Sequence, residues 1–353
     1  MKAFKYVLVY LLLIQLVLPY AVPFDLVFKD RMDYNLVKDN LESIDVILER
    51  ISRQIQDENL HDYIIILGDS IAFSGPGNAS QSIGSYMQEL ADQAEPDHPV
   101  RIYNLSMPAM QSGDIYTMLL KLDQHQISTQ NLIVNVDYKG FVLRQPGPAI
   151  VFWLPEDLQA LDPSTYQHMQ TNWPVSIPTQ SSIQAQVHRF LWNHVQMLRY
   201  SGFMKKGLIN VMRTMIGAAP VDDALGDARP WFEKEGLVQV LQQPEYQQEF
   251  SDQVFDMSRD NPEVYFWQKI IDHQVDRHTL IFLAAANQQL MAAQVNTPGY
   301  IHNLQLIDSY FQAQPVRYLN MYGRINADLF SDHMHLTAVG NRELTRILWD
   351  NFK

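Results

Sequence analysis

The stretch Tyr63–Ser70 reads Tyr-Ile-Ile-Ile-Leu-Gly-Asp-Ser and indicates both the fold of this chain and its chemistry. The first five residues form a short, β-branched apolar run bounded by turn residues, which predicts a buried parallel strand. The glycine and the aspartate end this run, and Ser70 follows where a strand passes into a helix. Open α/β sheets bind ligands at the carboxyl ends of their strands. We therefore expect Ser70 to face a binding crevice.

Further short apolar runs have the same character as the first. They are Val100–Asn104, Leu132–Val136, Thr279–Ala285 and Val316–Leu319. Helix-like segments at 83–90 and 115–122 separate the first three runs of the chain. This alternation predicts an α/β fold: a three-layer α/β/α sandwich of the flavodoxin-like type, with right-handed crossovers around a parallel sheet of about five strands.

The segment between Val136 and Thr279 is too long for a single crossover connection. We therefore expect a largely helical insert at about residues 141–275, within an α/β domain that spans 25–353. Ahead of the first strand, apolar residues recur at helical spacing over 36–55 and predict one long amphipathic helix.

Part of the predicted insert has an unusual charge pattern. Residues 163–221 contain no Asp or Glu, although the whole chain is acidic, and 188–215 mix basic, aromatic and apolar residues. Two interpretations stay open: a helix that lies on an anionic membrane surface, or a core helix with solvated charges. The acidic stretch 222–263 that follows is typical of a solvated helical surface.

The N-terminus has the pattern of an export segment. Lys2 and Lys5 precede the uncharged stretch 6–24, which is near the length needed to span a bilayer. Because Pro19-Tyr20-Ala21 is a poor cleavage site, we favour an uncleaved membrane anchor over residues 1–24, ahead of a cleaved signal peptide or a buried core helix. With either of the first two, the rest of the chain lies outside the cytoplasm.

Composition narrows the classes of function. The 353 residues are 47% apolar, which is enough for a sizeable core. A net charge of -13 argues against binding to nucleic acid, because that requires clustered Lys and Arg. The chain has no cysteine, so disulfides and thiolate metal sites are excluded. A large exported protein without disulfides is more typical of a bacterial cell envelope than of an animal secretion.

Near the C-terminus the sequence Asp332-His333-Met334-His335 supplies the partners that a reactive serine needs. A serine hydroxyl requires a base within hydrogen-bond reach and a third group that orients the base. Ser70, His335 and Asp332 fit these roles, and Thr337 is expected to cap the last helix behind them. The backbone N–H groups of Ser70 and Ser106 are candidate donors to an oxyanion.

The same residues allow less specific interpretations. Ser70 and Asp332 could be helix caps, and His335 a buried histidine with a satisfied hydrogen bond. His333 and His335 could form half of a metal site, but no carboxylate pair with zinc-ligand spacing accompanies them, so we expect neither a metal nor a cofactor. Asn287 could line the crevice or cap the next helix.

The blocks Gly68-Asp69-Ser70, Asn104-Leu105-Ser106 and Asp332-x-x-His335-Leu336-Thr337 together resemble the SGNH/GDSL hydrolase superfamily. The resemblance covers about 60–140 and 275–353 and implies Ser70 as nucleophile, with the Asp332 and His335 pair completing the triad. It also implies an oxyanion hole made of Ser70, of the Ser106 N–H, where the family has glycine, and of the Asn135 side chain. The third block of the family, Gly-x-Asn-Asp, is not matched at residues 135–140.

The anchor and the long insert are similar to the layout of SGNH-like proteins that work beside membrane-bound O-acyltransferases in bacterial envelopes. The resemblance thus implies an extracytoplasmic serine esterase or O-acyltransferase, acting on acyl esters, in particular acetyl esters, of envelope carbohydrate. A membrane-bound O-acyltransferase is the implied partner. The alternative is a non-catalytic envelope protein that keeps this fold and docks on such a partner.

Overall fold

The structure is a computed structural model. It describes residues 2–94, 100–143, 147–173, 187, 190–192, 194–221 and 223–353. The chain divides into two compact units. The N-terminal unit comprises Met1–Asn59 and Ser176–Asp223, and the sheet unit comprises Leu60–Val175 and Ala224–Lys353.

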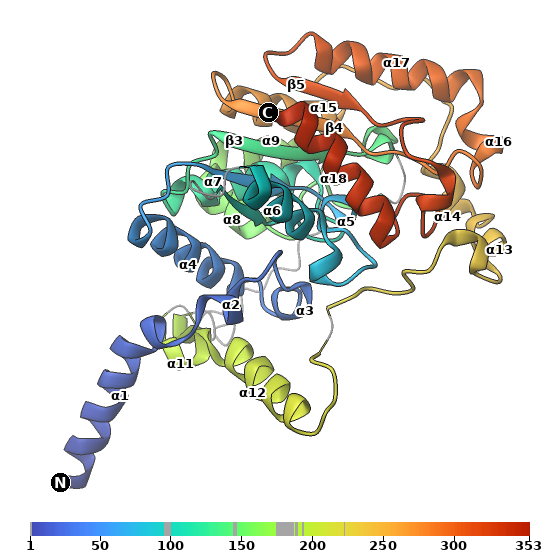
Figure 1. The fold of residues 1–353 in the computed structure, drawn as a ribbon. Helices are drawn as coiled ribbons and strands as arrows, with labels where there is room; N and C mark the ends of the chain where they lie inside the picture. Colours follow the sequence, from blue (N-terminus) through green and yellow to red (C-terminus); the bar gives the residue numbers. More distant parts are fainter. Residues whose placement is uncertain are drawn as a thin grey trace. The chain divides into compact units, whose positions relative to one another are not determined.

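The sheet unit is built on five parallel strands in the order β2-β1-β3-β4-β5 (Figure 1). They are β1 (Tyr63–Leu67), β2 (Arg101–Asn104), β3 (Asn131–Val136), β4 (His278–Leu283) and β5 (Arg317–Asn320). Each strand coincides with a predicted run to within a few residues. The prediction of an α/β fold around a parallel sheet of five strands is confirmed.

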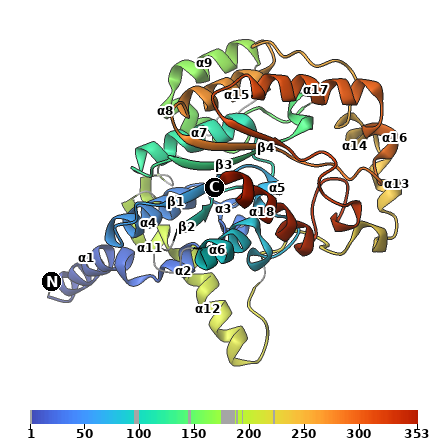
Figure 2. The ribbon, with the colours of Figure 1, turned by 45° about the horizontal axis from the view of Figure 1, so that its top comes forward.

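Helices pack on both faces of this sheet (Figure 2). On one face, α6 (Ile83–Ala94) packs against α18 (Ala338–Phe352). On the other, α7 (Ser112–Gln124) packs against α15 (Pro262–His273), and α17 (Pro298–Gln312) connects β4 to β5. Chain order explains this division. The connection from β1 to β2 runs toward one edge of the sheet and the connection from β2 to β3 runs toward the other, so right-handed crossovers place α6 and α7 on opposite faces.

The reversal of direction places a crevice at the carboxyl ends of β1 and β3. These two strands are neighbours, with Ile65 paired to Leu132, and β1 pairs on its other side with β2 through Ile64 and Ile102. All five residues of β1 are buried. The β-branched run therefore fills the centre of the sheet, and the residues that follow it emerge at the crevice.

The predicted insert, 141–275, is divided between the two units. Within the sheet unit it forms α8 (Pro155–Leu161), α9 (Pro163–Asn172), α13 (Leu237–Leu241), α14 (Pro244–Gln248) and α15. The last of these covers the sheet directly. Residues 144–146, 174–186, 188–189, 193 and 222 of the predicted insert lie outside the described residues.

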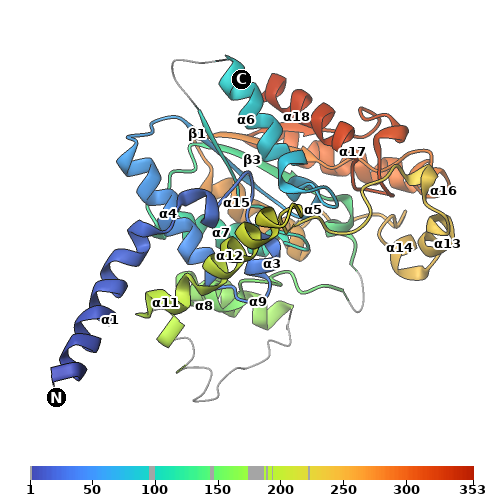
Figure 3. The same ribbon diagram turned by 60° about the horizontal axis from the view of Figure 1, so that its bottom comes forward.

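The remaining helices of the predicted insert belong to the N-terminal unit. They are α11 (Gln196–Arg199) and α12 (Ser201–Met215), and they join α1 (Lys2–Ala21), α2 (Phe24–Val27), α3 (Tyr34–Val37) and α4 (Ser43–Asp57) (Figure 3). Across the described part of the chain, no helix combines the length and the apolarity needed to cross a bilayer. The anchor expected at residues 1–24 stays a prediction.

The single long helix predicted over 36–55 is wrong, because the structure has two helices there. The Asp33 side chain accepts the N–H groups of Asn35 and Leu36 and so caps the short α3, which ends at Val37. Asp39 and Asn40 follow, and such residues bond to nearby backbone and favour turns over helix interiors. The helical spacing of apolar residues continues across this turn because α3 and α4 each bury apolar side chains.

Candidate active site

Ser70 is the first residue of α5 (Ser70–Phe73), directly after β1. Asp69 caps this short helix, since its Oδ1 accepts the Ile71 N–H at 2.9 Å. Gly68 has φ +151°, and a Cβ at this position would lie 1.7 Å from Oδ1 of Asn135. The glycine is thus required because β3 approaches the turn so closely, and this approach fixes where Ser70 emerges.

The other half of the site lies on the loop before α18. Thr337 caps that helix by accepting the Gly340 N–H, which confirms the expected N-cap. Asn287, just past β4, does not line the crevice. Instead it holds this loop, donating its backbone N–H to the His333 carbonyl at 2.9 Å and its Nδ2 to the Asp332 carbonyl at 3.3 Å.

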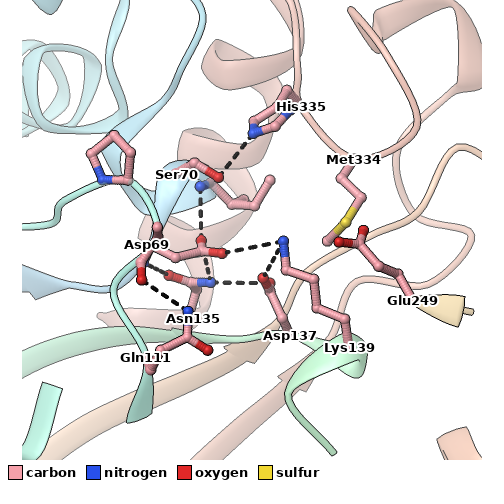
Figure 4. A network of polar contacts seen from close by, with 12 residues as sticks. Asp69, Ser70, Gln111, Asn135, Asp137, Lys139, Glu249, Met334 and His335 are labelled. Carbon is pink, nitrogen blue, oxygen red and sulfur yellow. Dashed lines mark hydrogen bonds and ion pairs between the residues drawn. The ribbon is translucent and has the colours of Figure 1, made fainter. Parts of the chain in front are cut away.

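The structure brings Ser70, His335 and Asp332 into one hydrogen-bonded chain. Nε2 of His335 lies 2.8 Å from Oγ of Ser70, and Nδ1 of His335 lies 2.8 Å from Oδ2 of Asp332. Figure 4 shows the first of these contacts, with His335 directed at Ser70. A hydroxyl, an imidazole and a carboxylate connected in this way have the geometry of a nucleophile, its base and the group that orients the base.

Asp332 is held in its charged form. Burial alone would raise its pKa, but the adjacent His335, its hydrogen bond and His333 together lower the pKa below the usual range of a carboxyl group. The backbone N–H groups of Met334 and His335 also bond to Oδ1 of Asp332, at 2.8 Å each. A charged carboxylate fixes a proton on Nδ1 of His335 and leaves Nε2 to accept one from Ser70.

The three predicted oxyanion donors differ in their surroundings. The Ser70 N–H has no acceptor among the described residues, and it lies at the N-terminus of α5. The Ser106 N–H already donates to Oδ1 of Asn104 at 3.1 Å. Nδ2 of Asn135 donates to Asp69 and Asp137, at 2.9 and 3.2 Å. Of the three, only Ser70 belongs to the triad, and only its N–H lacks a partner among the described residues and can bind a ligand.

Ala109 is a residue of the site that the sequence interpretation missed. It lines the same pocket as Ser70 and His335, and its φ is +62°, in the left-handed region. Within the described ranges, its N–H has no hydrogen-bond acceptor. Left-handed backbone at alanine has no sequence signal, because glycine and asparagine are the residues that favour it.

Two buried carboxyl groups, Asp69 and Asp137, lie beside Ser70 and face Lys139 (Figure 4). Burial, followed by the charge of Asp69, raises the pKa of Asp137 well above its usual value. Burial would likewise raise the pKa of Asp69, but the hydrogen bond with Asp137 and the charge of Lys139 lower it. The opposite directions of the two pKa shifts favour a proton on Asp137, in its hydrogen bond with the Asp69 carboxylate.

A pocket of about 610 Å³ adjoins the triad. Its polar lining consists of Asp69, Ser70, Gln111, Lys139, Asp227, Lys234, Glu249, Asp332 and His335. Its other lining residues are small or cyclic apart from Leu225: Gly75, Pro76, Pro108, Ala109, Pro148 and Gly226. Such a wall provides hydrogen-bonding groups for a polar molecule, beside the apolar surface of its small and cyclic residues.

No model of a known protein family matches the chain, and no curated protein matches it. Within the described ranges, no three His, Cys, Asp or Glu side chains are grouped in a way that could hold a metal ion.

Proposed function

We propose that this protein is an extracytoplasmic serine esterase or O-acyltransferase of the SGNH/GDSL type. The 2.8 Å contact between Nε2 of His335 and Oγ of Ser70, backed by Asp332, is the observation that carries the proposal. The strand order 2-1-3-4-5 supports the flavodoxin-like, three-layer form of the fold. The triad at the carboxyl edge of this sheet supports the family assignment.

In the proposed first step, Oγ of Ser70 attacks the carbonyl carbon of an ester while Nε2 of His335 takes the hydroxyl proton. The carbonyl oxygen becomes an oxyanion, which the N–H groups of Ser70 and Ala109 would bind. The tetrahedral intermediate then collapses: the carbon–oxygen bond to the alcohol breaks, and the proton on His335 passes to the departing alcohol. The acyl group remains on Ser70.

In the second step a hydroxyl group attacks the acyl-Ser70 ester, and His335 again takes the proton and returns it to Oγ. Water as attacking group gives hydrolysis, and a carbohydrate hydroxyl gives acyl transfer. The hydrogen-bonding groups of the pocket wall support a carbohydrate carrier, and the family resemblance adds a short acyl group such as acetyl. The envelope location and a membrane-bound O-acyltransferase partner complete the proposal and rest on the sequence pattern alone.

The non-catalytic docking protein remains the competing candidate, and one observation favours it. The Ser106 N–H and the Asn135 side chain, which the family resemblance assigns to the oxyanion hole, already have partners inside the protein. Catalysis would then depend on the remaining donors, Ser70 and Ala109.

An active-site-directed fluorophosphonate distinguishes the two candidates on the full chain. We expect labelling of the parent protein and none of Ser70→Ala, with circular dichroism showing that both are folded. Ser80→Ala, at an exposed hydroxyl in the same unit, is the matched control and should label normally. A folded parent protein that does not label favours the docking protein. Intact-mass measurement after mixing with acetyl or D-alanyl esters then identifies the acyl group carried by Ser70.

A further inference from the structure

Helix α12 of the N-terminal unit packs through one narrow face. Phe203 on that face is buried. A Cβ added to Gly207, one turn further on, would lie 2.7 Å from Cδ1 of Leu26, in the neighbouring α2. The glycine thus lets the two helices approach closely, and this face accounts for the attachment of α12 to its unit (Figure 3).

The other side of α12 is apolar and exposed. The exposed fractions are 62% for Leu208, 58% for Val211, 59% for Met212, 81% for Met215 and 80% for Ile216. The first four recur at i, i+3, i+4 and i+7, so they lie on one side of the helix. A surface helix normally turns its apolar side inward and its polar side to water. A contiguous exposed apolar row marks a surface that contacts something other than water.

The charged residues around this apolar row indicate what kind of surface it contacts. Lys205 is exposed and borders the apolar row, and the exposed Arg213 lies on the polar side of the same helix, whereas Lys206 is paired with Asp33. No acidic residue occurs from 163 to 221. Apolar side chains flanked by basic ones, with no acidic residue, match the interface of an anionic bilayer, where the apolar groups enter the acyl boundary and the cations meet phosphate.

A second exposed apolar helix belongs to the same unit. Leu11, Leu12, Leu16 and other residues of α1 are at least half exposed, and the Gln196 N–H of α11 donates to Oε1 of Gln15 in α1 at 2.9 Å. Helix α11 in turn contacts α12. A second copy of this chain fits the α12 row less well, because a two-fold contact would bring the basic residues Lys205 and Arg213 of one copy close to those of the other.

We propose that the exposed face of α12, residues 208–216, lies in the surface of an anionic lipid bilayer. This contact is separate from the predicted anchor and does not depend on catalysis. It would hold the N-terminal unit flat on the membrane through Leu208, Val211, Met212 and Met215, with Lys205 and Arg213 at the lipid phosphates.

Because the chain has no cysteine, a single introduced one reports on a single place. Full-length Met212→Cys and the matched control Thr214→Cys, which is also exposed but on the other side of α12, are labelled with a nitroxide. Both are incorporated into vesicles of phosphatidylglycerol and phosphatidylcholine. We expect the ratio of oxygen to nickel-chelate accessibility to be several-fold higher at position 212 than at 214.

Replacing Lys205 and Arg213 by Gln in the Met212→Cys background should lower the ratio of immersed to lifted helix by up to about 30-fold, since each basic residue near an anionic surface adds about a factor of five. Pure phosphatidylcholine should weaken immersion similarly. Equal accessibility at 212 and 214 overturns the proposal. Strong spin–spin coupling at 212 also overturns it, because a second copy then covers the face. Circular dichroism checks that each variant is folded.

Discussion

Both carboxylate oxygens of Asp332 form hydrogen bonds with His335. Oδ2 lies 2.8 Å from the imidazole Nδ1, while Oδ1 accepts the backbone N–H of the same histidine at 2.8 Å. One side chain therefore fixes both the ring and the loop that carries it. The two effects can be separated by a substitution that keeps the shape of Asp332 and changes its charge.

Asp332→Asn should lower the turnover of an ester by about 10⁴-fold, because an amide favours the wrong tautomer of His335. Steady-state kinetics on a small acetyl ester measures this loss. The matched control Asp328→Asn removes an exposed carboxyl group from the same loop region and should retain normal turnover. Near-normal turnover of a folded Asp332→Asn variant would falsify the orienting role.

His333 is the neighbouring histidine, and the distances assign it a lesser role than His335. Its Nδ1 lies 3.6 Å from Oδ1 of Asp332, longer than a hydrogen bond, and its ring packs edge-on against Tyr246 and Phe250. His333→Phe keeps these ring contacts. We expect turnover to fall by less than about tenfold, against the 10⁴-fold loss for Asp332→Asn. If the two losses are equal, His333 takes part in the proton transfer and the assignment of the base must change.

The proton held by Asp137 makes stability depend on pH. The pKa of Asp137 is raised above its ordinary 3.8 in the folded protein, so folding binds a proton that the unfolded chain releases. The contribution of Asp137 to stability is then greatest at low pH and falls as pH rises toward its folded pKa, by up to about 1.4 kcal/mol per pH unit. Asp137→Asn should abolish this decline, because an amide can donate to Asp69 at every pH.

Urea unfolding of parent and Asp137→Asn proteins between about pH 5 and pH 8 tests this expectation. The free energies of unfolding should diverge with rising pH, in favour of the variant. Asp328→Asn controls for the change of net charge. Parallel curves for Asp137→Asn and the parent would show that Asp137 does not hold a proton in the folded state.

Gly68→Ala should be among the most damaging small substitutions in the sheet unit. The new methyl group would overlap Oδ1 of Asn135, which adds about 1–3 kcal/mol of overpacking to about 1 kcal/mol of backbone strain. Ser70 would move with the turn, so fluorophosphonate labelling should also slow. Thermal and urea unfolding measure the loss of stability.

Gly236→Ala is the matched control for Gly68→Ala. Gly236 has φ +79° and no atom within 4 Å of an added Cβ, so only the backbone term remains. Equal losses in the two variants would mean that close packing against Asn135 is unimportant. If the packing explanation holds, Asn135→Ala should partly rescue Gly68→Ala, which a double-mutant cycle can quantify.

The sequence predicted the sheet well because its strands are buried on both faces. Such strands read as continuous apolar runs, and β1 and β4 needed no knowledge of their neighbours to be recognised. Helix α15 was harder to assign. It falls inside the predicted insert, yet it covers the sheet. A helix of an insert and a helix that covers a sheet have the same spacing of apolar residues, so the sequence does not distinguish them.

The triad could be predicted because parallel strands end at one edge, which places Ser70 near residues that follow the last strand. Which of the candidate oxyanion donors keep a free N–H group could not be predicted in the same way. Whether the Ser106 N–H is available depends on Asn104, and whether Ala109 is left-handed depends on local packing. The proton shared by Asp69 and Asp137 depends on burial, which no spacing reveals.

Ser70 and His335 are 265 positions apart in the sequence, and this has a consequence for biogenesis. During synthesis Ser70 leaves the ribosome with the first strand, but His335 belongs to nearly the last segment made. A nascent chain therefore carries Ser70 without the histidine that contacts it. On the proposed function, reactivity begins when the C-terminal helix docks, so the full length of the polypeptide must be made before an acyl group is captured.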